Sequence, residues 1–418
     1  MSRQVPPHRA ITMAFAYSGF AGAYLLSYVY RTVNAVISPE LTRELALDPA
    51  ALGLLTSAYF LAFGAFQVPA GMLLDRYGPR RVEPVLLTLA ALGSLLFAYA
   101  DSLGGLIVGR AIIGLGVSVC LMAPLKGIAT WYPRERQASL AGWIMVSGGI
   151  GALAASAPLE FLLRFVSWHM VFVGLAAVTF AVALFIAWRV PDTPRPEHAL
   201  GVRAQFAGVA DVVRNARFWW VGPLGAMVTG GFMAVQGLWA VPWMIEVEGL
   251  TRALAARHLL VMSLTVMAVY LCVGLFATRL AAAGLKAAHL VALGFGLNVV
   301  ALALITLRVP GSNLWWALYG GGSAVNVLVF TLLNEGFPRD LAGRANTALN
   351  LLMFAGSFIA QWGIGVIVDI ARDRAGLSVH DGLRIAFTTM LVLDAVVYTW
   401  FATRWRRHAR SVEAALAA

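Results

Sequence analysis

The sequence is short of charge and of cysteine. Only 12% of its 418 residues are charged, whereas 60% are hydrophobic. A water-soluble chain of this length needs more charge to cover its surface, so this composition excludes an ordinary soluble domain. The two cysteines, Cys120 and Cys272, both lie inside apolar runs. They exclude a disulfide framework and a cysteine-based metal site.

Several catalytic motifs are also absent. The sequence has no His-Glu-x-x-His, no Gly-x-Ser-x-Gly and no phosphate-binding Gly-x-x-x-x-Gly-Lys-Ser/Thr. His258 and His380, with Asp381 beside the latter, are expected in solvated loops. We therefore predict that the chain is not an enzyme and uses no cofactor or metal. Without an ATP site, any work that it performs must draw on gradients.

What the sequence does have is long apolar runs, such as 51–73 and 170–188. A helix needs about 20 mostly apolar residues to cross the bilayer core. Uncharged runs of this length do not suit the alternating strands of a β-barrel. The sequence thus predicts an all-α membrane protein with twelve transmembrane helices. We expect them at 10–37, 50–74, 82–101, 104–131, 138–164, 168–189, 217–245, 256–280, 286–307, 311–335, 341–370 and 383–403.

The positive charges are unevenly distributed over the loops. Most of the 31 Lys and Arg residues lie in the two tails and in the even-numbered loops. By the positive-inside rule, both termini are expected in the cytoplasm, with the helices in the inner membrane. The formal net charge of +11 is then a topology signal, so nucleic acid is not an expected partner. The first apolar block has no processing site, which argues against a cleaved signal peptide.

The chain also divides into two similar halves. The segment 190–216 is polar, contains three prolines and a short amphipathic stretch, and is expected to be a cytoplasmic linker. Gly71–Arg76 resembles Gly274–Arg279 at an offset of 203, and Tyr132–Glu135 resembles Phe337–Asp340 at an offset of 205. We therefore predict six-helix bundles at 1–189 and 217–418, related by pseudo-symmetry.

Two motifs carry a resemblance to the major facilitator superfamily. The segment Gly71-Met-Leu-Leu-Asp-Arg-Tyr-Gly-Pro-Arg-Arg81 is similar to its signature G-x-L-x-D-R-x-G-x-R/K-R/K. Arg110, Gly114 and Gly116 match the fourth-helix pattern R-x-x-x-G-x-G. With the hydropathy and the repeat, the resemblance covers nearly the whole chain. It implies a transporter that works by alternating access and says little about the substrate.

The first motif predicts a gate. Gly71 permits close helix packing, and Asp75, beside Arg76, can meet a helix amino terminus or the basic loop residues Arg134 and Arg136. Such a contact would hold one state of the cycle and break in the other. The alternative is that these charges only set topology. Thr278 replaces the aspartate in the second half, so an equivalent contact there is weaker.

The resemblance implies that helices 1, 4, 7 and 10 line a central cavity, helped by helices 2, 5, 8 and 11. Tyr24, Tyr28 and Arg31 share one face of helix 1. A guanidinium group there suits a carboxylate, which it can bind in bidentate fashion, although Arg31 can also snorkel to the outer surface. Arg110 and Lys126 share helix 4 but point apart unless Pro124 redirects it. Arg110 is the preferred ligand contact, and Lys126 either snorkels or adds a second anion contact.

Polar stripes on other helices are also expected to point inward, because lipid would penalise them. They either contact the substrate or join helices. The substrate-contact candidates among them are Gln236, Trp239, Tyr319, Asn326 and Asn350.

Acidic residues inside the expected spans are few. Glu160 lies four residues before Arg164, which indicates an ion pair. Asp394 falls in the middle of the last span, where a carboxylate must be partnered or protonated. Glu160 and Asp394 are therefore the proton-coupling candidates, although helix 12 normally packs outside the cavity.

The embedded charges lean positive, so we predict a monomeric secondary transporter for a small organic anion such as a carboxylate, coupled to a proton or counter-solute gradient. The alternative is a proton-coupled exporter of hydrophobic or cationic compounds. The glycines that flank the fifth-helix proline in drug antiporters are missing around Pro158, which weakens it. A membrane enzyme and a non-transporting sensor are the other classes considered.

Overall fold

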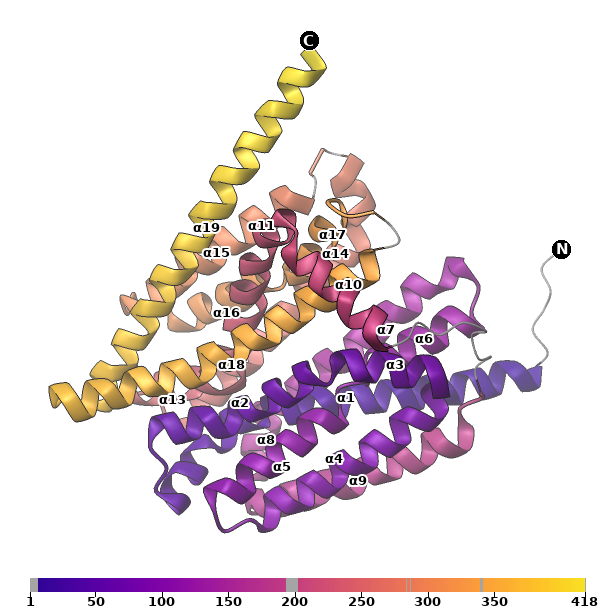
Figure 1. The fold of residues 1–418 in the computed structure, drawn as a ribbon. Coiled ribbons are helices and arrows are strands. Elements are labelled where there is room, and N and C mark those ends of the chain that lie inside the picture. Colours follow the sequence, from indigo (N-terminus) through magenta and orange to yellow (C-terminus); the bar gives the residue numbers. More distant parts are fainter. Residues whose placement is uncertain (1–6, 193–201, 283, 286, 339–340, 418) are drawn as a thin grey trace. The chain divides into compact units, whose positions relative to one another are not determined.

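A computed structural model describes residues 7–192, 202–282, 284–285, 287–338 and 341–417. Side chains are described for the same residues except 7–15, 134–135, 138, 202–206, 274, 277–282 and 406–417. Within this part of the chain every regular element is a helix (Figure 1). Contacts divide the chain into two compact units. Unit 1 comprises Met1–Leu47 and Ala58–Val202, and unit 2 comprises Asp48–Ser57 and Arg203–Ala418.

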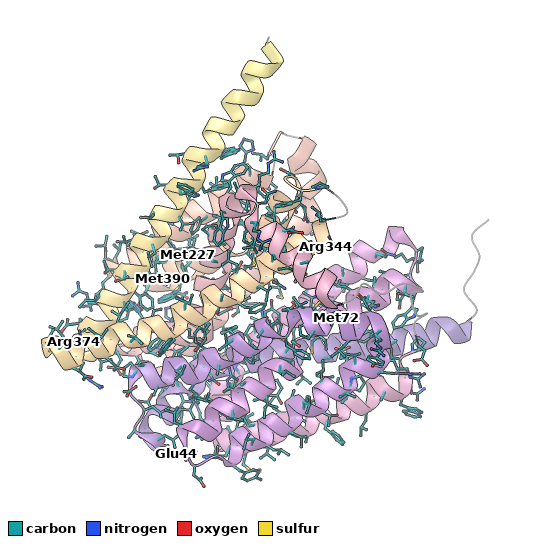
Figure 2. The ribbon with its side chains drawn as sticks, in the orientation of Figure 1. Glu44, Met72, Met227, Arg344, Arg374 and Met390 are labelled. Carbon is teal, nitrogen blue, oxygen red and sulfur yellow. The ribbon has the colours of Figure 1, made fainter. Side chains whose placement is uncertain are left out.

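Unit 1 is a bundle in which α4 packs along both α5 and α9, while α1 packs along α7 and α9 (Figure 1). At one end of α1 the exposed Glu44 accepts a hydrogen bond of 2.7 Å from the Trp168 indole, which ties α1 to α9 (Figure 2). The helices of the first half of the chain are α1 (Pro7–Leu45), α2 (Pro49–Ala65), α3 (Gln67–Tyr77), α4 (Pro79–Tyr99), α5 (Leu103–Gly116), α6 (Met122–Trp131), α7 (Arg134–Ala154), α8 (Ala157–Leu162) and α9 (Trp168–Arg189). The part of α2 up to Ser57 belongs to unit 2.

Four of the expected spans are broken into two helices, and three of these lie in the first half of the chain; the fourth divides into α16 (Ser312–Ser323) and α17 (Asn326–Asn334). α2 and α3 meet at Phe66 with a bend of 46°. α5 ends at Gly116 and α6 begins at Met122, just before Pro124, so the fourth span is redirected as a proline there allows. α7 and α8 are separated just before Pro158. Each break moves the side chains that follow it off the face that an ideal helix would give them.

The fourth-helix glycines permit very close packing. A Cβ atom at Gly114 would overlap the backbone carbonyl group of Tyr59 in α2. A Cβ atom at Gly116 would lie 2.5 Å from the backbone nitrogen of Ala90 in α4. Any larger residue would therefore push α5 away from its neighbours. This close approach brings Arg110 of α5 against the aromatic side chains of α2.

Unit 2 holds the remaining helices. Met227 and Met390 lie among its side chains (Figure 2). The helices are α10 (Val202–Arg214), α11 (Ala216–Gly225), α12 (Phe232–Ala234), α13 (Ala240–Glu246), α14 (Arg252–Ala282), α15 (Ala287–Thr306), α16 (Ser312–Ser323), α17 (Asn326–Asn334), α18 (Ala342–Ala375) and α19 (Val379–Ala417).

The seventh expected span is helical throughout but changes its winding. Two π-helical stretches, Ala226–Gly231 and Val235–Trp239, interrupt it around α12. A π turn contains one extra residue. The side chains that follow it are therefore rotated about the helix axis from the positions that a continuous α-helix would give them. Gln236 and Trp239 belong to the second of these stretches.

The amphipathic stretch expected in the linker is the helix α10. Val212 of α10 is buried in a core with Phe218, Val329 and Leu349, and Val209 packs against that core. The carboxyl end of the expected linker is therefore folded onto unit 2.

Nine helices are long and apolar enough to cross a membrane, or ten if α2 and α3 form one bent span, counting only residues that the structure describes. Each of the twelve ranges expected from the sequence contains described helix, but these helices do not confirm twelve spans. Several helices overrun the expected ends: α1 continues to Leu45, and α19 continues to Ala417. Hydropathy marks where a helix leaves lipid, whereas backbone hydrogen bonds decide where it ends.

Candidate functional site

The tyrosine and arginine face of α1 forms an aromatic cluster in unit 1. The Tyr24 and Tyr28 rings are 5.1 Å apart, edge to face. The Arg31 guanidinium carbon lies 4.5 Å from the centre of the Tyr28 ring and 5.4 Å from that of Phe63 in α2. The expected shared face is confirmed. Arg31 is only 7% exposed, so its side chain folds into unit 1 and does not reach out to the surface.

The rings of Tyr24 and Tyr28 pack against the backbone of α7. A Cβ atom at Gly148 would lie 2.6 Å from the Tyr24 ring and 2.8 Å from the Tyr28 ring. The Tyr24 hydroxyl group donates to the Met145 sulfur at 3.6 Å. The tyrosines therefore stand directly on the α7 backbone, where a side chain would displace them.

Arg110 lies on the other side of Tyr59 and is fully buried. Its Nη1 donates to the backbone carbonyl of Tyr30 at 2.9 Å, and its guanidinium carbon lies 5.0 Å from the Tyr59 ring centre. The Tyr59 hydroxyl donates to the Ser27 carbonyl at 3.2 Å. Among the described residues, Nε and Nη2 of Arg110 have no hydrogen-bond partner.

The two guanidinium groups are surrounded by phenols. The Arg31 guanidinium lies against the Tyr28 ring, and that of Arg110 lies against the Tyr59 ring. Phenols are neutral at physiological pH, so they do not cancel these charges. The cluster is thus positive and donor-rich, which favours an anion that can accept several hydrogen bonds. We call Tyr24, Tyr28, Arg31, Tyr59 and Arg110 the arginine cluster.

Lys126 is not part of the arginine cluster. Its ammonium group lies 2.7 Å from Oδ1 of Asp75 and donates to the Leu74 carbonyl at 2.7 Å. Sequence reasoning expected Asp75 to meet a helix amino terminus, Arg134 or Arg136. The partner that this structure shows is Lys126, which follows the break before α6 and reaches α3.

The other gating candidates make fewer contacts. Arg136 is exposed, and the Arg134 side chain lies outside the described residues. Arg76 is exposed and lies 5.2 Å from the ring centre of its neighbour Tyr77. A Cβ atom at Gly71 would meet no described atom within 4 Å, so the close packing expected there is not seen.

In unit 2 the polar candidates mostly join helices. Gln236 donates to Ser263 at 3.2 Å, and the Trp239 indole donates to the Gln361 carbonyl at 2.7 Å. Asn326 accepts from the Tyr270 hydroxyl at 3.1 Å. These contacts occupy groups that sequence reasoning assigned to substrate.

Tyr319 and Asn350 make up the rest of that set. Tyr319 is buried, and its backbone carbonyl accepts from Asn298 at 3.1 Å and from Ser323 at 2.9 Å. Asn350 is half-buried.

Sequence reasoning missed Glu248 because it lies in a loop. Its carboxylate accepts hydrogen bonds from the indoles of Trp243 at 3.0 Å and Trp316 at 3.1 Å, and from the hydroxyl of Ser312. Trp243 is fully buried and stacks on Phe387 with ring centres 4.2 Å apart. Trp243 is therefore a packed residue joined to a carboxylate and not an interfacial anchor.

Three acidic residues inside the expected spans differ in their surroundings, because one forms an ion pair and two are buried. Glu160 forms the expected ion pair with Arg164 at 3.1 Å. Asp394 is 1% exposed, and its Oδ1 has no hydrogen-bond partner in the described part of the chain. Glu83, in the second turn of α4, is fully buried and was missed. Its position between Val82 and Pro84, at the start of an apolar run, was the available signal.

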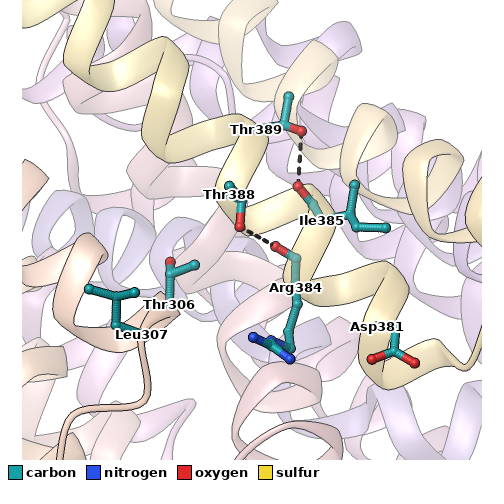
Figure 3. Close-up of a pocket in the computed structure, with 7 residues that line it drawn as sticks. All are labelled: Thr306, Leu307, Asp381, Arg384, Ile385, Thr388 and Thr389. Atoms are coloured by element: carbon teal, nitrogen blue, oxygen red, sulfur yellow. Dashed lines mark hydrogen bonds between the residues drawn. The ribbon is translucent and has the colours of Figure 1, made fainter.

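A separate hollow of about 400 Å³ opens in unit 2, where the end of α15 faces the start of α19 (Figure 3). The hydroxyl groups of Thr388 and Thr389 are directed back to the carbonyls of Arg384 and Ile385 at 2.7 and 2.9 Å. None of the residues predicted to bind substrate lines it. Its hydroxyls are committed to their own helix, so it is not a candidate site.

The long apolar helices among the described residues define a helical membrane protein. The chain matches the family model of the Major Facilitator Superfamily over residues 19–361. The chain belongs to this superfamily. The family prediction made from the two motifs is therefore confirmed.

Curated relatives match over part of the chain. The hexuronate transporter of Escherichia coli K12 is 28% identical over 211 residues, which cover 47% of this chain and 49% of the relative. A putative multidrug resistance protein, MdtD, of Yersinia enterocolitica is 28% identical over 172 residues, 41% of this chain and 37% of the relative. The chain thus spans about half or less of the length of these relatives.

The fold also resembles solved structures. A bacterial homologue of the human lysosomal transporter Spinster, in an inward-facing and unoccupied conformation, superposes with a TM-score of 0.72. The two chains are 17% identical, and the match covers 95% of this chain and 97% of the other. At this identity the likeness concerns the fold alone.

Proposed function

We propose that the protein carries a small organic anion with a carboxylate group across the inner membrane by alternating access. The observation that supports this most directly is Arg31, buried among tyrosines, with the fully buried Arg110 beyond Tyr59. Guanidinium groups bind carboxylates in a bidentate geometry that an ammonium group cannot reproduce. A hexuronate, the substrate class named for one relative, carries such a carboxylate.

The preference for an anion over a cation follows from the free-energy cost of burying a positive charge. Arg110 is fully buried, and its Nε and Nη2 have no hydrogen-bond partner among the described residues, so its burial costs free energy. An arriving carboxylate would relieve that cost, whereas a cation would increase it. The tyrosine hydroxyls add donors that suit the hydroxyl-rich body of a sugar acid. A proton or counter-solute gradient would drive transport, with Asp394 and Glu160 as the acids first predicted for coupling.

Transport also needs a gate and an orientation. The Asp75–Lys126 pair would hold one state of the cycle and break in the other, with Gly71, Arg76, Arg134 and Arg136 as further gating residues. The positive-inside rule would place both termini in the cytoplasm.

The test is uptake by the purified protein in liposomes. Radiolabelled glucuronate, with and without an inward pH gradient, should accumulate, and unlabelled galacturonate should compete. Arg31→Ala should abolish the uptake. If the protein instead moves ethidium, and glucuronate and galacturonate neither enter nor compete, the anion proposal is wrong.

Export of hydrophobic or cationic compounds is the second candidate, and the match to a putative multidrug resistance protein favours it. The aromatic rings around Arg31 would suit such compounds. Against it stands the charge of the arginine cluster, which would repel a cation. The ethidium arm of the same experiment decides between the two.

A further inference from the structure

Two hollows flank the start of α19 in unit 2. The first, of about 400 Å³, lies between the end of α15 and α19, and the second, of about 290 Å³, lies between the end of α18 and α19. Ile385 of α19 lines both hollows, so they adjoin at this side chain. The other residues that line the second hollow are Ile367, Ile370, Ala371, Arg374, Ala375 and Leu377.

Both hollows lie where membrane-crossing helices end. The apolar spans of α15 and α18 end at Thr306 and Ala375, and that of α19 begins at Val379. At such ends a span leaves hydrocarbon and meets the phospholipid head groups. Ile370 and Ile385, which line the hollows, are 47% and 43% exposed. Exposed apolar side chains on a membrane span are in contact with acyl chains, so lipid surrounds these hollows.

The arginine of the second hollow is not paired within the chain. Arg374 lies in the last turn of α18, is exposed, and forms no ion pair with any described residue (Figure 2). The two acids beside it, Asp369 and Asp373, both pair with Arg372, at 3.6 and 3.1 Å. The charge of Arg374 therefore remains for a partner outside the chain.

The arginine of the first hollow is in the same position. Arg384 lies in the second turn of α19, is exposed, and forms no ion pair in the described part of the chain (Figure 3). The nearby carboxylate of Asp381 accepts a hydrogen bond from Ser378 at 2.7 Å and lies 3.1 Å from the His380 ring nitrogen. A second unpaired guanidinium group thus lines these adjoining hollows.

The walls become less polar away from the two arginines. On α18, Ile370 and Ile367 lie about one and two turns from the arginine, toward the middle of the span. On α19, Thr388 and Thr389 lie about one turn from the arginine, and their hydroxyl groups donate to carbonyls of their own helix at 2.7 and 2.9 Å. That bonding makes the first hollow unsuited to a transported solute, but it lets hydrocarbon cover the wall without leaving these hydroxyls unsatisfied.

We propose that the two hollows bind one anionic phospholipid of the membrane, with its phosphate group at Arg374 and Arg384 and an acyl chain along the apolar walls. A phospholipid has the same order of chemistry, a phosphate followed by hydrocarbon. Guanidinium groups bind phosphate through paired N–H donors. The positive group of a zwitterionic lipid would lie near two unpaired arginines, which favours a lipid of net negative charge. The site belongs to unit 2 and does not rest on the proposed substrate.

Native mass spectrometry of the full-length protein tests the proposal. Phosphatidylglycerol is added in steps, and phosphatidylcholine with the same acyl chains is the comparison. The wild type should retain one phosphatidylglycerol molecule more tightly than any phosphatidylcholine. The double variant Arg374→Gln with Arg384→Gln should bind it about tenfold more weakly, because two charges near an anionic head group are lost. Arg257→Gln, at an exposed arginine of α14 in the same unit, is the matched control and should bind as the wild type does.

Photocrosslinking then locates the lipid. Ile385→benzoylphenylalanine, in nanodiscs with equal amounts of the two lipids, should give adducts enriched in phosphatidylglycerol. The same probe at Val300, an exposed apolar residue well inside α15, should show no such enrichment.

The proposal is overturned if phosphatidylcholine binds as tightly as phosphatidylglycerol, or if the double variant binds as the wild type does. Equal enrichment at Ile385 and Val300 would also contradict it. If inorganic phosphate displaces the lipid, the hollows hold a free anion and the lipid assignment is wrong. None of these measurements uses glucuronate, so a failure of the proposed substrate would leave their results unchanged.

Discussion

The ammonium group of Lys126 lies 2.7 Å from Oδ1 of Asp75 and joins α6 to the last turn of α3. The lysine is 24% exposed and the aspartate 49%, so this is a half-solvated pair. Pairs of this kind contribute about 1 kcal/mol or less to stability. Their charges are therefore better suited to a contact that breaks and reforms than to one that holds the bundle together.

We predict that Asp75→Asn and Lys126→Gln each slow transport severalfold while changing the free energy of unfolding by less than about 1 kcal/mol. The exchanged pair Asp75→Lys with Lys126→Asp should recover much of the lost rate. Liposome flux and thermal unfolding measure the two quantities. Arg214→Gln, at an exposed position of α10, is the control. A large loss of stability in the single variants would show that the pair is structural.

Arg31→Lys should bind glucuronate at least tenfold more weakly than the wild type, because an ammonium group cannot form the bidentate contact. Arg31→Ala should show no binding. Isothermal titration calorimetry measures both. Arg43→Gln, which removes an exposed arginine from the far end of the same helix, should bind as the wild type does. Equal binding by Arg31→Lys and the wild type would contradict a bidentate contact.

Arg110→Met should raise the melting temperature or leave it unchanged while abolishing transport. Methionine fills a similar volume and removes a buried charge whose Nε and Nη2 are unsatisfied in the described structure. The lost bond to the Tyr30 carbonyl offsets part of the gain. Thermal unfolding and flux are measured on the same preparation. A marked fall in melting temperature would show that Arg110 serves packing and not transport.

Gly148→Ala should reduce transport strongly, because its Cβ atom would push the Tyr24 and Tyr28 rings off α7. Gly142→Ala lies on the same helix, where a Cβ atom would meet no described atom within 4 Å. There the substitution should only favour the helix, by up to about 1 kcal/mol. Flux through both variants is the measurement, and equal activity would contradict the role given to the tyrosine rings.

Glu248→Gln should destabilise the protein by about 2 to 4 kcal/mol. Both indoles donate to the same carboxylate oxygen, Oε1, and the Ser312 hydroxyl donates to Oε2. The amide therefore offers both indole N–H groups a neutral acceptor in place of a charged one, and Ser312 loses its acceptor or faces an NH₂ group. Thermal unfolding checks this prediction, with Glu246→Gln as the control. An unchanged melting temperature would mean that the indoles find other acceptors.

Much of the fold could be predicted because lipid imposes a simple rule. Backbone groups must be satisfied within each span, so the apolar runs had to be helices, and each expected range is helical. The shared face of Tyr24, Tyr28 and Arg31 also followed from spacing alone, since α1 is continuous there. Side-chain positions were harder to predict after a break in a helix. Lys126 follows the break between α5 and α6, and it pairs with Asp75 of α3.

The amino-acid sequence by itself determined the helical class, the superfamily and the positive character of the embedded residues, because hydropathy, short motifs and charge are properties of local segments. Only the tertiary structure decided which polar groups meet. Glu248 accepts hydrogen bonds from two indoles, one on a helix before it and one on a helix after it. Glu83 is fully buried in α4, next to Pro84. The contacts of Glu248 and the burial of Glu83 depend on how helices that are distant in the sequence pack together. The spacing of residues within one segment does not contain that information.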